Sequence, residues 1–169
     1  MTVSVYGGIM MLELGPSGDV EYFFRCINYF VETPKKILLP LITDRLYKRY
    51  VVVEDFAELR ENFVFIESIF KNTEVLSCDF EEYIVGEKDR RLNPKEPTLD
   101  LLFKTYFSSF KDCMKTAEST KENFGTYVPL IIGRDIVAPK FAVGKNDSKG
   151  EKIRERYDAL EGNPLWWGA

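Results

Sequence analysis

The longest regular pattern of apolar positions in this chain runs from Thr98 to Gly125. Apolar side chains recur there at spacings of three and four residues, so one face of a helix is apolar for about five turns. Thr98 suits a helix N-cap, and Gly125 can adopt the left-handed conformation that ends a helix. The pattern predicts one long helix over 98–124 whose apolar face the rest of the chain must cover. That face consists of Leu99, Leu102, Phe103, Tyr106, Phe107, Phe110, Cys113, Met114, Ala117 and Phe124.

Three further segments, 19–32, 54–71 and 148–160, also have helical spacing. We expect Asp19 to cap the first of these helices, and Pro34 to stop it near Glu32. The third opens with the capping-box pattern Ser-x-x-Glu. The second has apolar residues spaced by three and four, which predicts packing against an antiparallel helix. These apolar residues are Phe56, Leu59, Phe63, Ile66 and Phe70.

Strand patterns are shorter than the helical ones. Residues 2–14 alternate around Gly7 and Gly8, which predicts either a strand with a glycine bulge or a hairpin with a Gly-Gly turn. Residues 75–78 read as a short strand, and 127–132 is the most strand-like run in the second half. The helices outweigh these strands, so the sequence predicts an α+β fold in which a small sheet packs against helices.

Residues 36–50 remain ambiguous between helix and edge strand because Pro40 interrupts their apolar run. The apolar tail Leu165–Trp167 either folds back into the core or serves as an exposed aromatic anchor for another protein. No internal repeat or linker interrupts the chain. We therefore expect a single globular domain over residues 1–169.

Composition and the pattern of cysteines indicate the cellular compartment of the protein. The chain has 169 residues, 45% of them apolar, and no run approaches the roughly 18 apolar residues that a membrane helix needs. The N-terminus lacks the basic region that begins a secretory signal. Cys26, Cys78 and Cys113 are an odd number at unrelated spacings, which favours buried reduced thiols over disulfides. A cytoplasmic protein is expected.

The chain contains no histidine, which removes the commonest general base and the commonest metal ligand. The acids Asp79, Glu81 and Glu82 lie close together in sequence, but they lack the spacing and the glycine of a calcium loop. No second carboxylate cluster accompanies them, so a carboxylate-based hydrolase is disfavoured. We expect no enzyme activity, no metal and no cofactor.

The charge is distributed unevenly along the chain, with a net of −6 over residues 1–85 and of +2 over residues 86–169. The formal net charge is −4, yet residues 54–82 carry nine acids against only Arg60 and Lys71. Such density opposes contact with nucleic acid and suits a basic partner. On the predicted second helix, like charges one turn apart cost a few tenths of a kcal/mol per pair. Either lysines elsewhere in the fold neutralise these acids or a cationic partner does. The predicted contact set is Glu54, Glu58, Glu61, Asp79, Glu81 and Glu82.

An alternative function is RNA binding or RNA processing. Two tyrosines flank two cations in the segment 47–50, a composition that can form a stacking platform for single-stranded RNA. The same composition is also typical of an amphipathic rim around a core. The residues of this alternative site are Tyr47, Lys48, Arg49, Tyr50, Arg90 and Arg91.

The two ends of the chain, Thr2–Leu14 and Tyr157–Trp166, resemble bacterial immunity proteins of contact-dependent growth inhibition systems. The resemblance implies a small protein that binds the C-terminal toxin domain of a cognate effector, often a tRNA-cleaving nuclease. It implies inhibition by occlusion, without a cofactor. A nuclease must be cationic where it holds RNA phosphates. An inhibitor with an acidic surface can fill such a site.

Overall fold

The computed structural model of the protein describes residues 2–78, 91–125, 128–134 and 163–167. Within these ranges it confirms the expected fold class, a helix-rich α+β fold with a small antiparallel sheet packed against helices. Several predictions lie outside the described residues. They are the helix over 148–160 and the candidate site residues Asp79, Glu81, Glu82 and Arg90.

The long apolar helix is present but begins with a short separate turn. Helix α4 (Leu99–Leu102) leads into α5 (Lys104–Phe124) through Phe103, whose φ of −100° and ψ of 16° interrupt the helical geometry. Gly125 ends α5 in the left-handed conformation, with a φ of 65°. Nine of the ten predicted face positions are buried. Phe124 is the exception, because it lies in the last turn, where no described element covers it.

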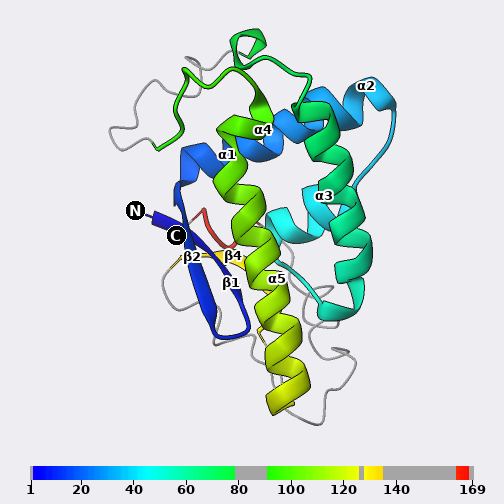
Figure 1. The fold of residues 1–169 in the computed structure, drawn as a ribbon, viewed down its shortest axis with the longest axis vertical. Coiled ribbons are helices and arrows are strands. Elements are labelled where there is room, and N and C mark those ends of the chain that lie inside the picture. The colour runs from blue at the N-terminus through cyan, green and yellow to red at the C-terminus, as the bar shows by residue number, and fades with distance from the viewer. Residues whose placement is uncertain (1, 79–90, 126–127, 135–162, 168–169) are drawn as a thin grey trace.

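Helix α3 (Phe56–Phe70) follows a 3₁₀ turn, Val53–Asp55, and runs antiparallel to α5 (Figure 1). All five apolar residues predicted for its seam are buried. The Phe63 ring stacks on Phe110 of α5, with ring centroids 5.2 Å apart and planes 5° from parallel. The spacing of apolar residues was therefore sufficient to predict which side of α3 enters the core.

Helix α1 (Ser17–Ile27) continues into a π-helical turn, η1 (Asn28–Glu32), and then into α2 (Thr33–Lys35). The predicted stop near Glu32 is thus wrong. Pro34 lies in the first turn of α2, where its missing N–H is tolerated, and the wider π turn absorbs the change in hydrogen-bond register. Asp19 is also no cap, because the helix begins two residues earlier.

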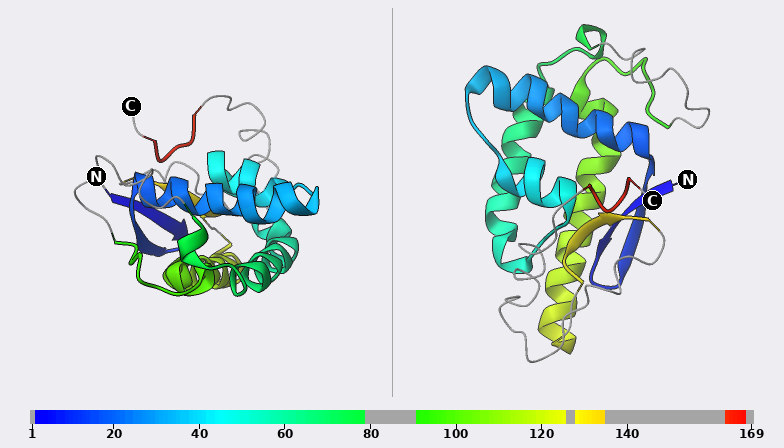
Figure 2. Two further views of the ribbon diagram at one scale, coloured as in Figure 1. Left: turned by 90° about the horizontal axis from the view of Figure 1, so that it is seen from above. Right: turned by 180° about the vertical axis from the view of Figure 1, so that it is seen from behind.

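The helices form two layers. Figure 2 shows α1 and α2 crossing one side of the α3–α5 pair. The Phe23 ring of α1 lies between these layers and contacts rings of α5, with centroids 5.2 Å from Tyr106 and 5.7 Å from Phe110. Aromatic contacts at this junction therefore form the centre of the core, as the aromatic face of α5 requires.

The sheet has the strand order β2-β1-β4-β3, with all neighbours antiparallel. Its strands are β1 (Thr2–Gly7), β2 (Met10–Pro16), β3 (Tyr50–Val51) and β4 (Leu130–Gly133). Strand β4 confirms the strand predicted near 127–132.

The first two strands form a hairpin, and the alternative of one bulged strand is wrong. Gly7 pairs with Met10, so the two-residue loop consists of Gly8, at a φ of 58°, and Ile9. The strand expected at 75–78 is instead a 3₁₀ turn, Val75–Ser77.

The C-terminal segment 163–167 packs onto the body of the protein, near η2 (Leu41–Leu46) and the sheet (Figure 2). Trp166 is 1% exposed, and its indole N–H donates to the carbonyl of Tyr47 at 2.8 Å. Trp167 is 44% exposed. The first alternative for the tail, that it folds back into the core, is therefore confirmed for Trp166. No helix in the described ranges is both long enough and apolar enough to cross a bilayer.

Candidate protein-interaction face

Helix α3 presents its charged residues on two different sides. The side towards α5 carries ion pairs that join the two helices. Their order along α3 is the reverse of their order along α5, as antiparallel packing requires. The N–O distances of these pairs are 2.5 Å for Glu54–Lys121, 2.6 Å for Arg60–Glu118 and 2.7 Å for Glu67–Lys111.

These ion pairs separate the residues of the predicted acidic ridge. The charge of Glu54 is neutralised within the molecule by Lys121, which is the intramolecular alternative left open by the sequence. The hydrogen bonds that Arg60 donates to the Glu118 carboxylate hold the pKa of Arg60 above its usual value. Both Glu54 and Arg60 are therefore already engaged before any partner binds.

Glu58 and Glu61 are exposed and have no ion-pair partner among the described residues. They are three residues apart, and Glu61 lies one turn from Val64 and Phe65 on the same side of the helix. Val64 is 64% exposed and Phe65 is 37% exposed. We call Glu58, Glu61, Val64 and Phe65 the outer face of α3.

The outer face combines two features that favour a partner. Two uncompensated carboxylates attract a cationic surface and repel each other slightly in its absence. The adjacent apolar atoms would be removed from water by the same partner, at about 25 cal/mol per Å² buried. In protein interfaces, charged groups orient the partner and buried apolar area contributes affinity. Val64 and Phe65 have the character of an apolar interface centre, and Glu58 and Glu61 that of its charged rim.

Sequence reasoning missed Val64 and Phe65. The seam at spacings of three and four accounts for Phe63 and Ile66, and it leaves positions 64 and 65 on the solvent side. Two apolar residues at solvent positions were the available signal. Asp79, Glu81 and Glu82, the remaining predicted contact residues, lie outside the described part of the chain.

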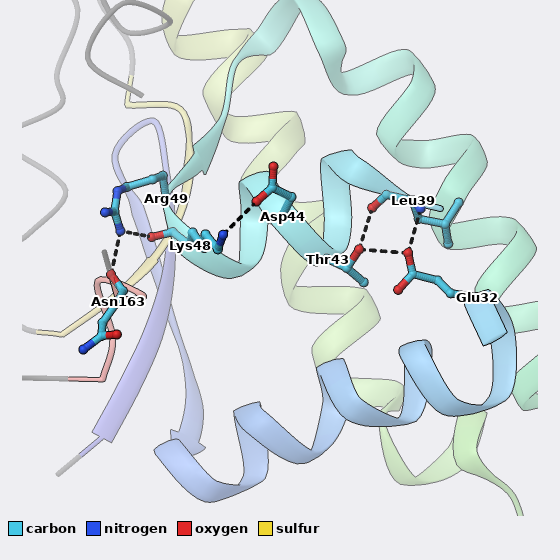
Figure 3. Close-up of polar contacts among 7 residues, drawn as sticks. All are labelled: Glu32, Leu39, Thr43, Asp44, Lys48, Arg49 and Asn163. Atoms are coloured by element: carbon cyan, nitrogen blue, oxygen red, sulfur yellow. Dashed lines mark hydrogen bonds and ion pairs between the residues drawn. The ribbon is translucent and has the colours of Figure 1, made fainter. Parts of the chain in front are cut away.

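The predicted RNA-stacking platform is not formed. Arg49 and Tyr50 are buried, so neither can offer an exposed surface to a base. The Arg49 guanidinium donates to the carbonyls of Lys48 and Asn163, both at 2.7 Å (Figure 3). Arg91 pairs with Glu13 at 2.5 Å, and this contact lowers the pKa of Glu13. These cations therefore serve contacts within the fold.

Among the described residues, no cluster of three Cys, Asp or Glu side chains is placed to hold a metal. Burial, with a smaller effect of Asp112, raises the pKa of the Cys113 thiol to about 12. A neutral buried thiol is a poor nucleophile at physiological pH.

Protein-family models, curated proteins and solved structures were compared with this chain, and none matches it.

Proposed function

We propose that this protein is an immunity protein that binds a cognate toxin domain and neutralises it by covering its active site or its substrate-binding surface. The partner is a basic domain, with an RNA-cleaving nuclease as the expected class. The observation that carries the proposal is the outer face of α3. There, two carboxylates that have no ion-pair partner among the described residues lie beside two exposed apolar side chains, while Arg60 and Glu67 are paired with α5.

The charge distribution supports this partner class by a simple electrostatic argument. A domain that binds RNA phosphates is positive at its substrate surface, because much of that affinity is electrostatic. Glu58 and Glu61 would approach such a surface favourably and raise the association rate. Asp79, Glu81 and Glu82 extend the proposed contact set, and Glu54 is retained in it with its charge already shared with Lys121.

The first test is genetic and biochemical. The C-terminal domain encoded by the gene immediately upstream is expressed with and without this chain, and growth is measured together with complex formation. We expect the domain to arrest growth alone and to form a stable complex when both proteins are present. An upstream product without toxicity, or continued growth arrest despite well-folded protein, would contradict the proposal.

A second test uses three matched variants on one helix. Glu58→Gln and Glu61→Gln each remove an uncompensated charge, and each should slow association with the toxin domain by about threefold at low salt. Glu67→Gln removes a charge on α3 that is already paired with Lys111, and it serves as the control. It should change the rate less. Equal effects of all three variants would show that the outer face does not direct association.

A further inference from the structure

A cavity of about 580 Å³ lies between α1, η1, η2 and the turn at Val75–Ser77. Its volume falls within the range of small-molecule sites, roughly 300–1,000 Å³. None of its described lining residues belongs to the outer face of α3. A ligand of this cavity would therefore contact different residues from a partner bound to the outer face of α3.

Aromatic rings account for much of the cavity lining. Phe24 and Tyr47 meet edge to face with ring centroids 5.0 Å apart, and Tyr29 and Phe30 do so at 4.9 Å. Ring edges and faces that line a cavity favour a planar aromatic occupant, which can stack or meet them edge to face. Tyr29 is also 68% exposed, so one ring of the site lies at its opening to solvent.

The charges that line the cavity compensate each other. Among the described lining residues only Glu21 and Arg25 are charged, and their Oε1 and Nε atoms are 3.6 Å apart. Glu21 also accepts hydrogen bonds from the Tyr47 hydroxyl at 3.0 Å and the Trp167 indole at 3.3 Å. A charged occupant would lose hydration without gaining an uncompensated counter-charge. The lining therefore favours an uncharged occupant.

A buried carboxylate fixes two polar groups at the cavity wall. Glu32 accepts hydrogen bonds from Asn28 Nδ2 at 3.3 Å and from Thr43 Oγ1 at 2.9 Å, and both of these residues line the cavity. It also accepts one from the Leu39 amide at 2.8 Å, which joins η1 to the start of η2 (Figure 3). π-helical turns are rare and occur often at functional sites, and here two of them frame one cavity.

This arrangement determines which hydrogen-bonding capacity remains for an occupant. The only hydroxyl hydrogen of Thr43 is taken up by Glu32 and the Leu39 carbonyl, and Asn28 uses one of its amide hydrogens towards Glu32. The Asn28 amide oxygen and the Thr43 hydroxyl oxygen keep acceptor capacity. An occupant with an N–H donor can use these acceptors. We propose that the cavity is a binding site for a small, uncharged, planar aromatic compound that carries an N–H group.

Indole is a suitable probe, with three analogues that each change one property. 1-Methylindole lacks the donor, tryptamine adds a positive charge and indole-3-acetate adds a negative charge. Calorimetric titration of the full chain should show indole binding. Each analogue should bind at least about tenfold more weakly, a difference of about 1.4 kcal/mol. Absence of indole binding at about 5 mM, or tighter binding of a charged analogue, would overturn the proposal.

Thiol modification locates the bound probe. Cys78 lines the cavity and is partly exposed, whereas Cys113 is fully buried against the Val5 carbonyl. Indole should slow the reaction of Cys78 with N-ethylmaleimide several-fold, as measured by mass spectrometry of peptides, and leave Cys113 unchanged. Unaltered Cys78 modification at saturating indole would place the probe elsewhere and overturn the assignment.

Two serines provide a matched pair of variants. Ser77 lines the cavity and Ser68 lies on α3, and each is exposed and donates to the carbonyl three residues earlier at 2.6 Å. Ser77→Phe should weaken indole binding at least tenfold, whereas Ser68→Phe should not. If circular dichroism shows that Ser77→Phe is unfolded, Tyr29→Ala, which removes an exposed ring, takes its place. Equal indole binding by the cavity variant and by Ser68→Phe would overturn the proposal.

Discussion

The guanidinium group of Arg60 donates to both carboxylate oxygens of Glu118, at 2.8 and 2.6 Å, and so joins α3 to α5 by a two-pronged contact. Both side chains remain about two-fifths exposed. The contact fixes the rotation of α3 about its axis, together with the aromatic seam beneath it. That rotation places Glu58 and Glu61 on the side away from α5.

A double-mutant cycle measures what this pair contributes to stability. Arg60→Ala, Glu118→Ala and the double variant should give a coupling free energy of about 0.2–1 kcal/mol, because exposed pairs are weakened by solvent screening. The measurement is urea-induced unfolding at low salt and at about 1 M salt. A coupling that persists unchanged at high salt would show that packing, and not charge, joins the two side chains.

The two components of the outer face of α3 should have different kinetic effects. Val64→Ala with Phe65→Ala removes apolar area, so dissociation from the toxin domain should become faster while the salt dependence of association stays the same. Glu58→Gln with Glu61→Gln should slow association and flatten its salt dependence. Leu76→Ala, which truncates a residue 90% exposed elsewhere, is the control. Equal dissociation rates for Leu76→Ala and the apolar double variant would exclude Val64 and Phe65 from the interface.

Glu32 should be important for stability although its hydrogen-bond partners among the described residues, Asn28, Leu39 and Thr43, lie outside the outer face of α3. Its buried carboxylate accepts three hydrogen bonds, one from each of these residues. In glutamine one carboxylate oxygen is replaced by an NH₂ group, which is itself a donor and cannot accept a hydrogen bond from these residues. We expect Glu32→Gln to lower the free energy of unfolding by about 1.5–3 kcal/mol. Glu74→Gln, at an exposed position, should stay within about 0.5 kcal/mol of wild type. Similar denaturant midpoints for the two variants would contradict this role of Glu32.

The two C-terminal tryptophans should differ strongly in their effect on stability. Trp166→Ala removes a side chain that is almost completely buried, and we expect a loss of about 3–5 kcal/mol. Trp167→Ala removes a half-exposed ring and one hydrogen bond to Glu21, so its loss should be clearly smaller. Denaturant unfolding of both variants provides the comparison, and equal losses would show that the tail is not anchored through Trp166.

Gly7 should tolerate no side chain, because of its close contact with α5. A Cβ atom at this position would lie 2.1 Å from the carbonyl oxygen of Cys113, which is backbone and cannot rotate away. Gly7→Ala should therefore lower the free energy of unfolding by about 3 kcal/mol or more. Gly15→Ala meets no atom closer than 3.5 Å and strains only the backbone, whose φ is 131°. Its cost should be nearer 1–2 kcal/mol, and the opposite order would contradict the close packing of β1 on α5.

The sequence alone determined the elements whose local signals agree with one another. Regular apolar spacing and a terminal glycine predicted the long helix that ends at Gly125. The spacing of apolar residues from Phe56 to Phe70 predicted the buried side of α3. Around the glycine pair the sequence left a bulged strand and a hairpin open, and the structure shows the hairpin, with Gly8 and Ile9 as its loop. Backbone geometry fixes the period at which side chains return to the same face, 3.6 residues in a helix and 2.0 in a strand. The buried face can therefore be predicted without knowledge of distant contacts.

Only the tertiary structure decided which charges and rings remain available to a partner. Pairing of Glu54 with Lys121 depends on residues 67 positions apart, and local sequence carries no information about such a contact. The burial of Arg49 and Tyr50 likewise depends on the sheet and on the tail at Asn163. The sequence predicted that the first helix stops before Pro34, whereas in the structure a π turn, Asn28–Glu32, leads into α2 and the helix continues past Pro34. Local backbone geometry fixes which side of a helix or strand each side chain occupies. Which of these side chains stay exposed and unpaired depends on the distant segments that pack against the element.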